Sequence, residues 1–128
     1  MDLRAYFEGA RGQGFLATAG RDGQVDVAVY SRPRVLEDGT LVFGMTDRLT
    51  HAHVAQNPHA TYAFHEGRFQ GVRLYLEKVG EETEGSLLEE IRARADEVVG
   101  PGVGDRVRFA VRFRVRKVLP LVGDGSVP

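Results

Sequence analysis

One stretch, residues 25–58, restricts the fold more than any other part of this sequence. It reads VDVAVYSRPRVLEDGTLVFGMTDRLTHAHVAQNP, and apolar residues recur at every second position in its runs 25–30 and 41–45. This period is typical of strands that bury one face. The Asp38-Gly39 pair between the two runs is a strong signal for a tight hairpin turn. The stretch therefore predicts two antiparallel strands joined by a hairpin, with a helix directly after them.

Basic and hydroxyl side chains gather around the place where the second of these strands meets the helix. The group consists of Ser31, Arg32, Thr46, Arg48, Thr50 and His51. Thr46 or Asp47 is expected to cap the helix, whose first N–H groups have no partners within the helix itself. Such an end attracts anions, and guanidinium groups bind phosphate through paired hydrogen bonds. The corner is a candidate phosphate pocket, and the alternative is a capped helix whose first turn is simply basic.

The rest of the chain predicts a barrel. Strands are expected at residues 14–20, 25–30, 41–45, 59–66, 71–79 and 107–116. Helices are expected at 2–10, after the third strand, and at 86–98, where Ser86 and Glu89 form a capping-box pattern. Strands with two bare sheet edges would invite association, so we expect the sheet to close. The expected fold is mainly β, a single domain over residues 1–128 that forms a six-stranded antiparallel barrel with helices at its margin.

Composition narrows the possible partners. There are 17 Lys plus Arg against 18 Asp plus Glu, for a formal net charge of -1, so no global field favours nucleic acid or an acidic membrane. The absence of cysteine leaves no disulfide or thiolate site and fits a reducing compartment. No apolar run approaches the roughly 20 residues that span a bilayer, and the N-terminus does not read as a signal peptide. We expect a soluble, cytoplasmic protein without a nucleic-acid or membrane partner.

Two further patterns in the sequence are typical of functional sites. His51 and His53 would lie about 200° apart around a helix, whereas helical metal ligands are three or four residues apart, so no metal site is expected. The last strand carries an arginine stripe made of Arg108, Arg112, Arg114 and Arg116. Single-strand nucleic-acid barrels interleave aromatics with such a face, whereas Phe109 and Phe113 fall on the core side. We expect a solvated or dimer-bridging arginine face, with single-strand binding as the alternative.

The order of these features resembles the flavin-binding split barrels related to pyridoxamine 5'-phosphate oxidase. The resemblance covers residues 13–79, through the Asp-Gly hairpin, the strand ending VFGMTDR, the helix LTHAHVAQNP and the strand HATYAF. The segment KVLPLVG at 117–123 fits the same layout. The resemblance implies a six-stranded antiparallel split β-barrel with flanking helices. It also implies a homodimer that binds two FMN molecules in clefts between its subunits.

The resemblance further implies which residues hold the cofactor. Arg48 falls where the family often has a serine and Thr50 where it often has a lysine, so the two would meet the phosphate with exchanged roles. Ala28 and Pro33 fall nearest to two earlier basic positions of the family, for which Arg32 or Arg34 would substitute. The implied cofactor-binding set is Tyr30, Ser31, Arg32, Pro33, Met45, Thr46, Arg48, Thr50, His51 and Arg73.

On this basis we expect an FMN-dependent oxidoreductase in which the flavin carries the redox chemistry. The alternative is a non-catalytic protein of the same fold that binds FMN, haem or a related cofactor, and a deazaflavin in place of FMN stays open. No catalytic acid or base is assigned. The chain stops short of the tail in which pyridoxamine phosphate oxidases carry substrate-binding arginine and histidine, so poor activity on pyridoxine vitamers is expected.

Overall fold

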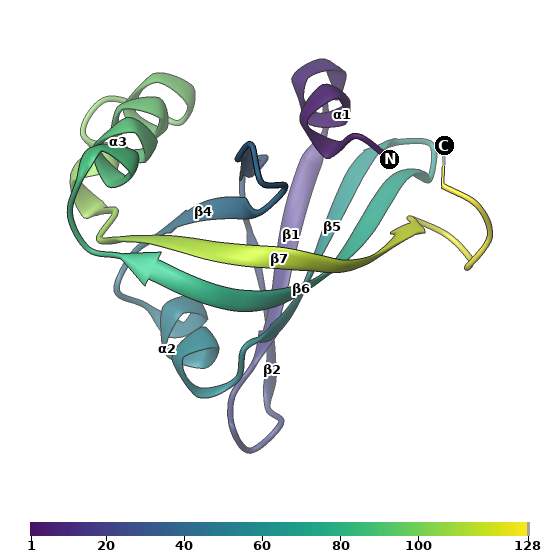
Figure 1. Cartoon of the computed structure of the whole chain (residues 1–128), viewed down its shortest axis with the longest axis horizontal. Coiled ribbons are helices and arrows are strands. Elements are labelled where there is room, and N and C mark those ends of the chain that lie inside the picture. Colours follow the sequence, from purple (N-terminus) through teal and green to yellow (C-terminus); the bar gives the residue numbers. More distant parts are fainter. Residues whose placement is uncertain (128) are drawn as a thin grey trace.

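The computed structural model describes residues 1–127 and contains one antiparallel sheet with helices around it (Figure 1). Its elements are α1 (Leu3–Gly9), β1 (Gln13–Ala19), β2 (Val25–Val29), β3 (Arg34–Val35), β4 (Leu41–Met45), α2 (Leu49–Gln56), β5 (His59–Gly67), β6 (Gln70–Glu82), α3 (Ser86–Val98), the 3-10 helix η1 (Val103–Arg106) and β7 (Phe109–Pro120). The strand order is β2-β1-β5-β6-β7-β4-β3. None of the described helices combines the length and the apolar character that a bilayer crossing needs.

The sheet has seven strands and stays open, whereas a closed barrel of six strands was expected. Its edge strands, β2 and β3, are joined by residues 30–33 but are not paired with each other in the described chain. Pro33 has no N–H to donate to a ladder. Arg32 turns its side chain to α1, where Nη1 donates to the carbonyls of Phe7 and Ala10. The boundary between β2 and β3, which residues 30–33 span without strand pairing, is therefore open, and we call it the seam.

The Asp-Gly turn forms as predicted, but it joins β3 to β4 and not β2 to β4. The backbone N–H of Leu36 donates a hydrogen bond to the carbonyl of Thr40 across the turn. Gly39 has a φ of +85°, which glycine adopts without strain. Asp38 accepts hydrogen bonds from the hydroxyl and the backbone N–H of Thr40, and these bonds lower the pKa of its carboxyl group. The strand was misassigned because β3 has only two residues and so shows no alternation.

The longer strands bury one face, as their alternation predicts. Val72, Leu74 and Leu76 of β6 are each at most 2% exposed. Aromatic rings pack against one another at the centre of this main core, mostly edge to face. The ring cluster consists of Phe7, Phe43, Tyr62, Phe64 and Phe113. Because Phe7 belongs to α1, the N-terminal helix is packed onto the same core.

β4 is buried on both faces, which its alternation did not predict. One face belongs to the main core, while Val42 packs with Leu88 and Ile91 of α3 in a second, smaller core. Gly44 permits this approach, because a Cβ atom there would come within 2.6 Å of Ile91 Cγ2. Helix α3 therefore covers the outer side of β4 and the adjoining part of β7.

Both predicted helix caps are wrong. α3 has Gly85 as its N-cap, and no side chain accepts a hydrogen bond in the capping position that Ser86 was expected to fill. α2 has Arg48 as its N-cap, in an extended conformation and without a side-chain cap bond. Thr46 and Asp47 lie before this position. The first N–H groups of α2 are therefore not capped by any side chain of the described chain.

Candidate functional site

A cavity of about 370 Å³ lies where β2 and β4 end, and residues at the start of α2 and along α3 both line it. We call it the corner cavity, and its volume is typical of small-molecule sites, which span roughly 300–1,000 Å³. Its polar lining consists of Tyr30, Ser31, Arg32, Arg34, Thr46, Arg48, Thr50 and Arg94. Its apolar side chains include Val42, Ile91, Ala95, Val98, Val99, Val103 and Val107. The two kinds of lining suit a ligand with an anionic part and an apolar part.

Most of the residues that the sequence implied line this corner cavity. They are Tyr30, Ser31, Arg32, Thr46, Arg48 and Thr50. Residues 30–32 reach it because they follow the last paired residue of β2 and enter the seam. Residues 46–50 reach it because β4 ends there and α2 begins. Their role toward a ligand stays a prediction.

The remaining implied residues lie outside the corner cavity. They are Pro33, Met45, His51 and Arg73. Met45 is fully buried in the main core, and Pro33 faces a neighbouring cavity. Arg73 donates from Nε to the carbonyl of Pro120 at 2.9 Å and from Nη2 to the carbonyl of Gly123. Its guanidinium group therefore holds the C-terminal backbone against β6.

His51 anchors the start of α2 to the sheet. Its ring stacks on Phe109, with the centroids 3.6 Å apart and the planes 4° apart. Its Nε2 lies 3.0 Å from Oε1 of Glu81, which also accepts from Nζ of Lys78 at 2.7 Å. Burial raises the pKa of Glu81, but the bonds with Lys78 and His51 outweigh burial and leave the pKa below its ordinary value. These contacts hold Arg48, at the end of the same helix, beside the cavity.

Tyr30 forms the wall between the main core and the corner cavity. Its ring packs edge to face on Phe43 with the centroids 5.8 Å apart, and its carbonyl accepts from the hydroxyl of Tyr62 at 3.0 Å. Burial raises the pKa of Tyr30, and a hydrogen bond with Thr50 offsets part of that effect. The Tyr30 hydroxyl therefore stays protonated at neutral pH and can donate a hydrogen bond.

Positive charge dominates the corner cavity. Arg48 and Arg94 form no ion pair within residues 1–127, while Arg34 pairs with Glu90 at 2.8 Å. Arg32 is partly committed to the end of α1, because its Nη1 bonds the two carbonyls there at 2.7 and 2.8 Å. No aspartate or glutamate belongs to the described lining. An anion is therefore the ligand part that this end of the cavity favours.

Comparison with known proteins identifies the fold. Neither a family model nor a curated protein matches the sequence. An FMN-binding protein of Syntrophomonas wolfei subsp. wolfei superposes with a TM-score of 0.78 at 20% identity, over 94% of this chain and 84% of that one. A pyridoxamine 5'-phosphate oxidase-like protein of Lactobacillus delbrueckii gives a TM-score of 0.68 at 12% identity, over 93% and 92% of the chains. An F420 reductase gives 0.64 at 16%, over 85% and 90%.

The chain has the split-barrel fold. This finding confirms the antiparallel split barrel that the resemblance implied, but the expected number of six strands was wrong, because the sheet has seven. The open seam between β2 and β3 is where this split barrel departs from a closed one. Because the identities are 20% or less, the likeness shows the fold and leaves the activity to be argued from the site.

One wall of the split barrel's cavity was missed by the sequence reasoning. It comes from α3 and η1, which contribute Arg94, Val98, Val99 and Val103. Val98 and Val99 are 58% and 62% exposed, although the sequence places Val98 on the buried stripe of α3. The available signal was this apolar pair at the end of an otherwise charged helix. The pair could not be recognised as part of a cavity from the sequence, because only the tertiary structure places α3 beside the seam.

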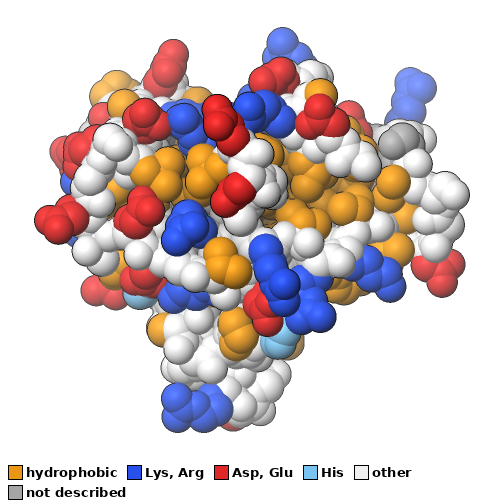
Figure 2. All heavy atoms as spheres, viewed as in Figure 1, with side chains coloured by type: hydrophobic (Ala, Val, Ile, Leu, Met, Phe, Trp, Pro, Cys, Tyr) orange, Lys and Arg blue, Asp and Glu red, His pale blue; other side chains and the backbone are white. Residues whose placement is uncertain are grey.

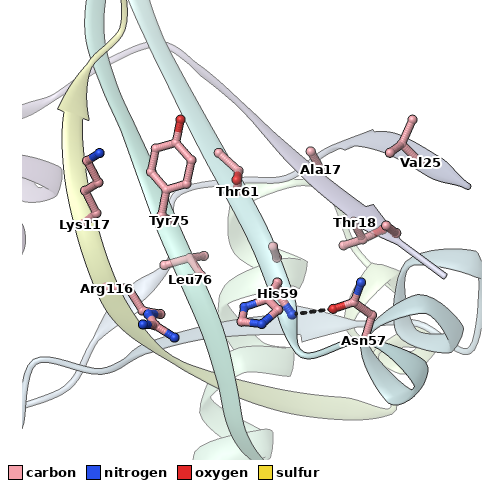
Figure 3. A pocket seen from close by; sticks show the side chains of 12 residues that line it. Ala17, Thr18, Val25, Asn57, His59, Thr61, Tyr75, Leu76, Arg116 and Lys117 are labelled. Carbon is pink, nitrogen blue, oxygen red and sulfur yellow. Dashed lines mark hydrogen bonds between the residues drawn. The ribbon is translucent and has the colours of Figure 1, made fainter. Parts of the chain in front are cut away.

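A shallower groove of about 680 Å³ crosses the other side of the split barrel's sheet (Figure 3). Lys117, Tyr75, Thr61 and Ala17 lie in a row across β7, β6, β5 and β1, with Val25 beyond them on β2. We call this side of the sheet the outer face. Its middle is made of small or apolar side chains, and none of the implied cofactor residues lines the groove.

Three arginines of the stripe, Arg112, Arg114 and Arg116, lie on β7 beside carboxylates of β6, whereas Arg108 precedes β7 and forms no ion pair in the described chain. Arg114 donates from Nε to Glu77 at 2.6 Å, and Arg116 lies 3.6 Å from the same carboxylate. Arg112 lies 3.8 Å from Glu82. Figure 2, which views the side that carries β6 and β7, shows blue and red side chains interspersed. These three arginines therefore form ion pairs with carboxylates of β6.

Histidines are engaged in local contacts. Residues 1–127 hold no group of three or more His, Cys, Asp or Glu side chains placed to bind a metal ion. His53 is buried, and its Nδ1 lies 3.0 Å from the hydroxyl of Thr18, which ties α2 to β1. His51 contacts β6 and β7, and His53 contacts β1. The short helix α2 is therefore held against the sheet from two sides.

Replacing Glu81 by glutamine should destabilise the protein in a pH-dependent way. The folded pKa of Glu81 lies below its ordinary value of 4.5, so the carboxylate stabilises the fold above that pH and stops doing so as the pH falls through the folded value. Urea unfolding should show a loss of about 1 kcal/mol near neutral pH that fades as the pH falls through the folded pKa of Glu81. Glu84→Gln, at an exposed glutamate of the same region, is the control. An equal loss at neutral pH and below the folded pKa of Glu81 would contradict the ion-pair account.

Proposed function

We propose that this protein binds FMN in the corner cavity, with the phosphate at the start of α2 and the ring system toward α3. The observation that carries the proposal is one cavity that joins an unpaired arginine and an uncapped helix start to an apolar wall. The solved neighbour described as an FMN-binding protein supports the same ligand class.

The phosphate end is the better defined part of the proposed site. Arg48 is the N-cap of α2, and the N–H groups that follow it have no side-chain acceptor in the described chain. The hydroxyl groups of Thr46 and Thr50 lie in the same lining, and Arg94 approaches from α3. Helix N-terminal amides, hydroxyl groups and guanidinium groups are the donors that protein phosphate sites use. The donor set therefore fits a phosphate monoester.

The apolar end fits a flat ring system. Val98, Val99 and Val103 offer methyl groups to the cavity, and Tyr30 offers a hydroxyl that can donate a hydrogen bond to a ring oxygen or nitrogen. A bound flavin would supply the electron-transfer chemistry. The residues of the chain would bind and orient it and exclude water from one side of the ring. Beyond the hydrogen bond from the Tyr30 hydroxyl, that task requires no proton transfer by a residue of the chain.

The proposed activity is that of a flavin-dependent oxidoreductase, and the alternative is a non-catalytic flavin carrier. A deazaflavin would use the same cavity, and the F420 reductase among the neighbours favours testing it. Haem is less well served, because no histidine, methionine or cysteine belongs to the described lining, which leaves Tyr30 as the one side chain there of a type that ligates haem iron. Steady-state oxidation of a reduced nicotinamide by the FMN-loaded protein is expected for an enzyme, and a carrier would show none.

We further infer that the protein is a homodimer whose second copy covers the outer face. Val25, Val27 and Val29 of the edge strand β2 are 62–70% exposed, and monomers rarely leave such a row uncovered. Val29 also lines the corner cavity, so the apolar face continues to the mouth of the proposed flavin site. A two-fold contact uses the same patch on both subunits, as a flat sheet face allows. The partner would then close one side of that mouth.

Replacing Arg48 by alanine should weaken FMN binding about 10–100-fold, because a charge-assisted phosphate contact is lost. Titration of the apoprotein with FMN, followed by flavin fluorescence, measures the effect. Riboflavin, which lacks the phosphate, should bind the variant and the parent protein equally well.

Arg21→Ala, at an exposed arginine far from the cavity, is the matched control and should leave both affinities unchanged. Equal losses for FMN and riboflavin in Arg48→Ala would mean that Arg48 supports the fold of the site and does not hold the phosphate. No binding of FMN to the parent protein would remove the proposed function.

Replacing Val27 by glutamate should convert the dimer to a monomer, because it places a charge in the middle of the covered apolar row. Sedimentation or light scattering gives the mass. Val79→Glu introduces the same charge at an exposed valine of β6 that does not line the groove, and it should leave the mass of a dimer. A monomeric parent protein, or a dimer in both variants, would contradict this interface.

A further inference from the structure

A third cavity lies beside the corner cavity, between α1 and α3, the two helices in the upper part of Figure 1. Its volume is about 530 Å³, and it is lined by α1, by the chain that links β2 to the Asp-Gly turn, and by Arg94 of α3. We call it the side cavity. Arg32, Arg34 and Arg94 line both cavities, so a wall of arginines separates the two and faces each of them.

The arginine wall is larger than one phosphate monoester needs. Arg48 and the start of α2 already serve a phosphate from the corner cavity, whereas Arg4 lines only the side cavity. Arg4 donates from Nη2 to the carbonyl of Val35 at 3.0 Å, which holds its guanidinium group over the side cavity and leaves other N–H groups for a ligand. Positive charge therefore continues past the proposed flavin site into a second space.

Nothing in the side cavity neutralises this charge fully. Its described lining has the four arginines Arg4, Arg32, Arg34 and Arg94 against the two carboxylates Glu8 and Glu37. Arg34 is paired with Glu90, but the side chains of that pair are 42% and 53% exposed. Exposed pairs of this kind contribute little, so a phosphate could replace Glu90 at Arg34. Arg94 forms no ion pair in the described chain and is available from the start.

We propose that the side cavity binds a second phosphate-bearing group, adjoining the phosphate of the flavin across the arginine wall. The ligand chemistry is a diphosphate or nucleotide phosphate. It can belong to a dinucleotide flavin that spans both cavities or to a separate nucleotide that binds next to FMN. The link to a flavin rests on the proposed function, whereas the phosphate site itself rests on the arginines of the side cavity.

Two variants change the side cavity without touching the corner cavity. Arg4→Ala removes one cation and should weaken phosphate binding about tenfold. Glu8→Gln removes an opposing charge at an exposed position of α1 and should strengthen it, which a merely misfolded variant could not do. Arg21→Ala, at an exposed arginine that lines neither cavity, is the matched control and should leave phosphate binding unchanged.

Calorimetric titration with ADP and with inorganic pyrophosphate tests the proposal, on the apoprotein and on FMN-saturated protein. If FMN-saturated protein binds ADP, with weaker binding in Arg4→Ala and tighter binding in Glu8→Gln, the second ligand is a separate nucleotide. If FAD binds more tightly than FMN and Arg4→Ala abolishes that advantage, the ligand is a dinucleotide flavin. Either result supports the site.

The proposal is overturned if neither ADP nor pyrophosphate binds and FAD binds no better than FMN. It is also overturned if Arg4→Ala and Glu8→Gln leave these affinities unchanged. A protein that binds ADP in an Arg4-dependent way but does not bind FMN would keep the phosphate site and remove the proposed flavin function. The two failures are therefore distinguishable.

Discussion

The seam between β2 and β3 is the constraint on which the rest of the structure depends. If residues 30–33 continued the hydrogen-bonded ladder, their side chains would alternate between the core and the outer face, and the corner cavity would have no floor. Pro33 cannot donate to a ladder, and Arg32 is held at the end of α1 by two carbonyls. The Tyr30 carbonyl is satisfied by Tyr62, so the backbone leaves the sheet without an unpaired group at that point.

Pairing of charge explains how a nearly neutral chain offers a basic site. On β6 and β7 the nitrogen atoms of the arginines lie 2.5 to 3.8 Å from the carboxylate oxygens of the glutamates, so their charges largely cancel. Around the seam Arg4 and Arg32 instead bond backbone carbonyls, which keeps their full charge, and Arg48 and Arg94 form no ion pair in the described chain. Arg34 does pair with Glu90, but that pair is solvent-exposed. Local positive potential then arises without a basic protein overall.

The two sides of the sheet carry different side chains and are therefore suited to different contacts. The inner side holds the ring cluster and is closed by α1, while the outer face keeps small side chains in its middle and exposed valines at its edge. A face of this kind is suited to packing against a flat partner, and its continuity with Val29 links that contact to the proposed flavin site. Oligomeric state and ligand binding would in that case depend on the same strand.

The sequence by itself determined the strands with clear alternation, the Asp-Gly turn and the basic corner at the start of α2, because these depend on neighbouring residues. It also carried the resemblance that pointed to the split barrel. It could not show that, among the described residues, β2 pairs only with β1, that β4 is buried on both faces, or that α3 supplies Arg94 and an apolar wall. It assigned Arg73 to a ligand, although that guanidinium group bonds the carbonyls of Pro120 and Gly123. Only the tertiary structure decides such matters, because a strand's partner and an arginine's acceptor come from residues far away along the chain.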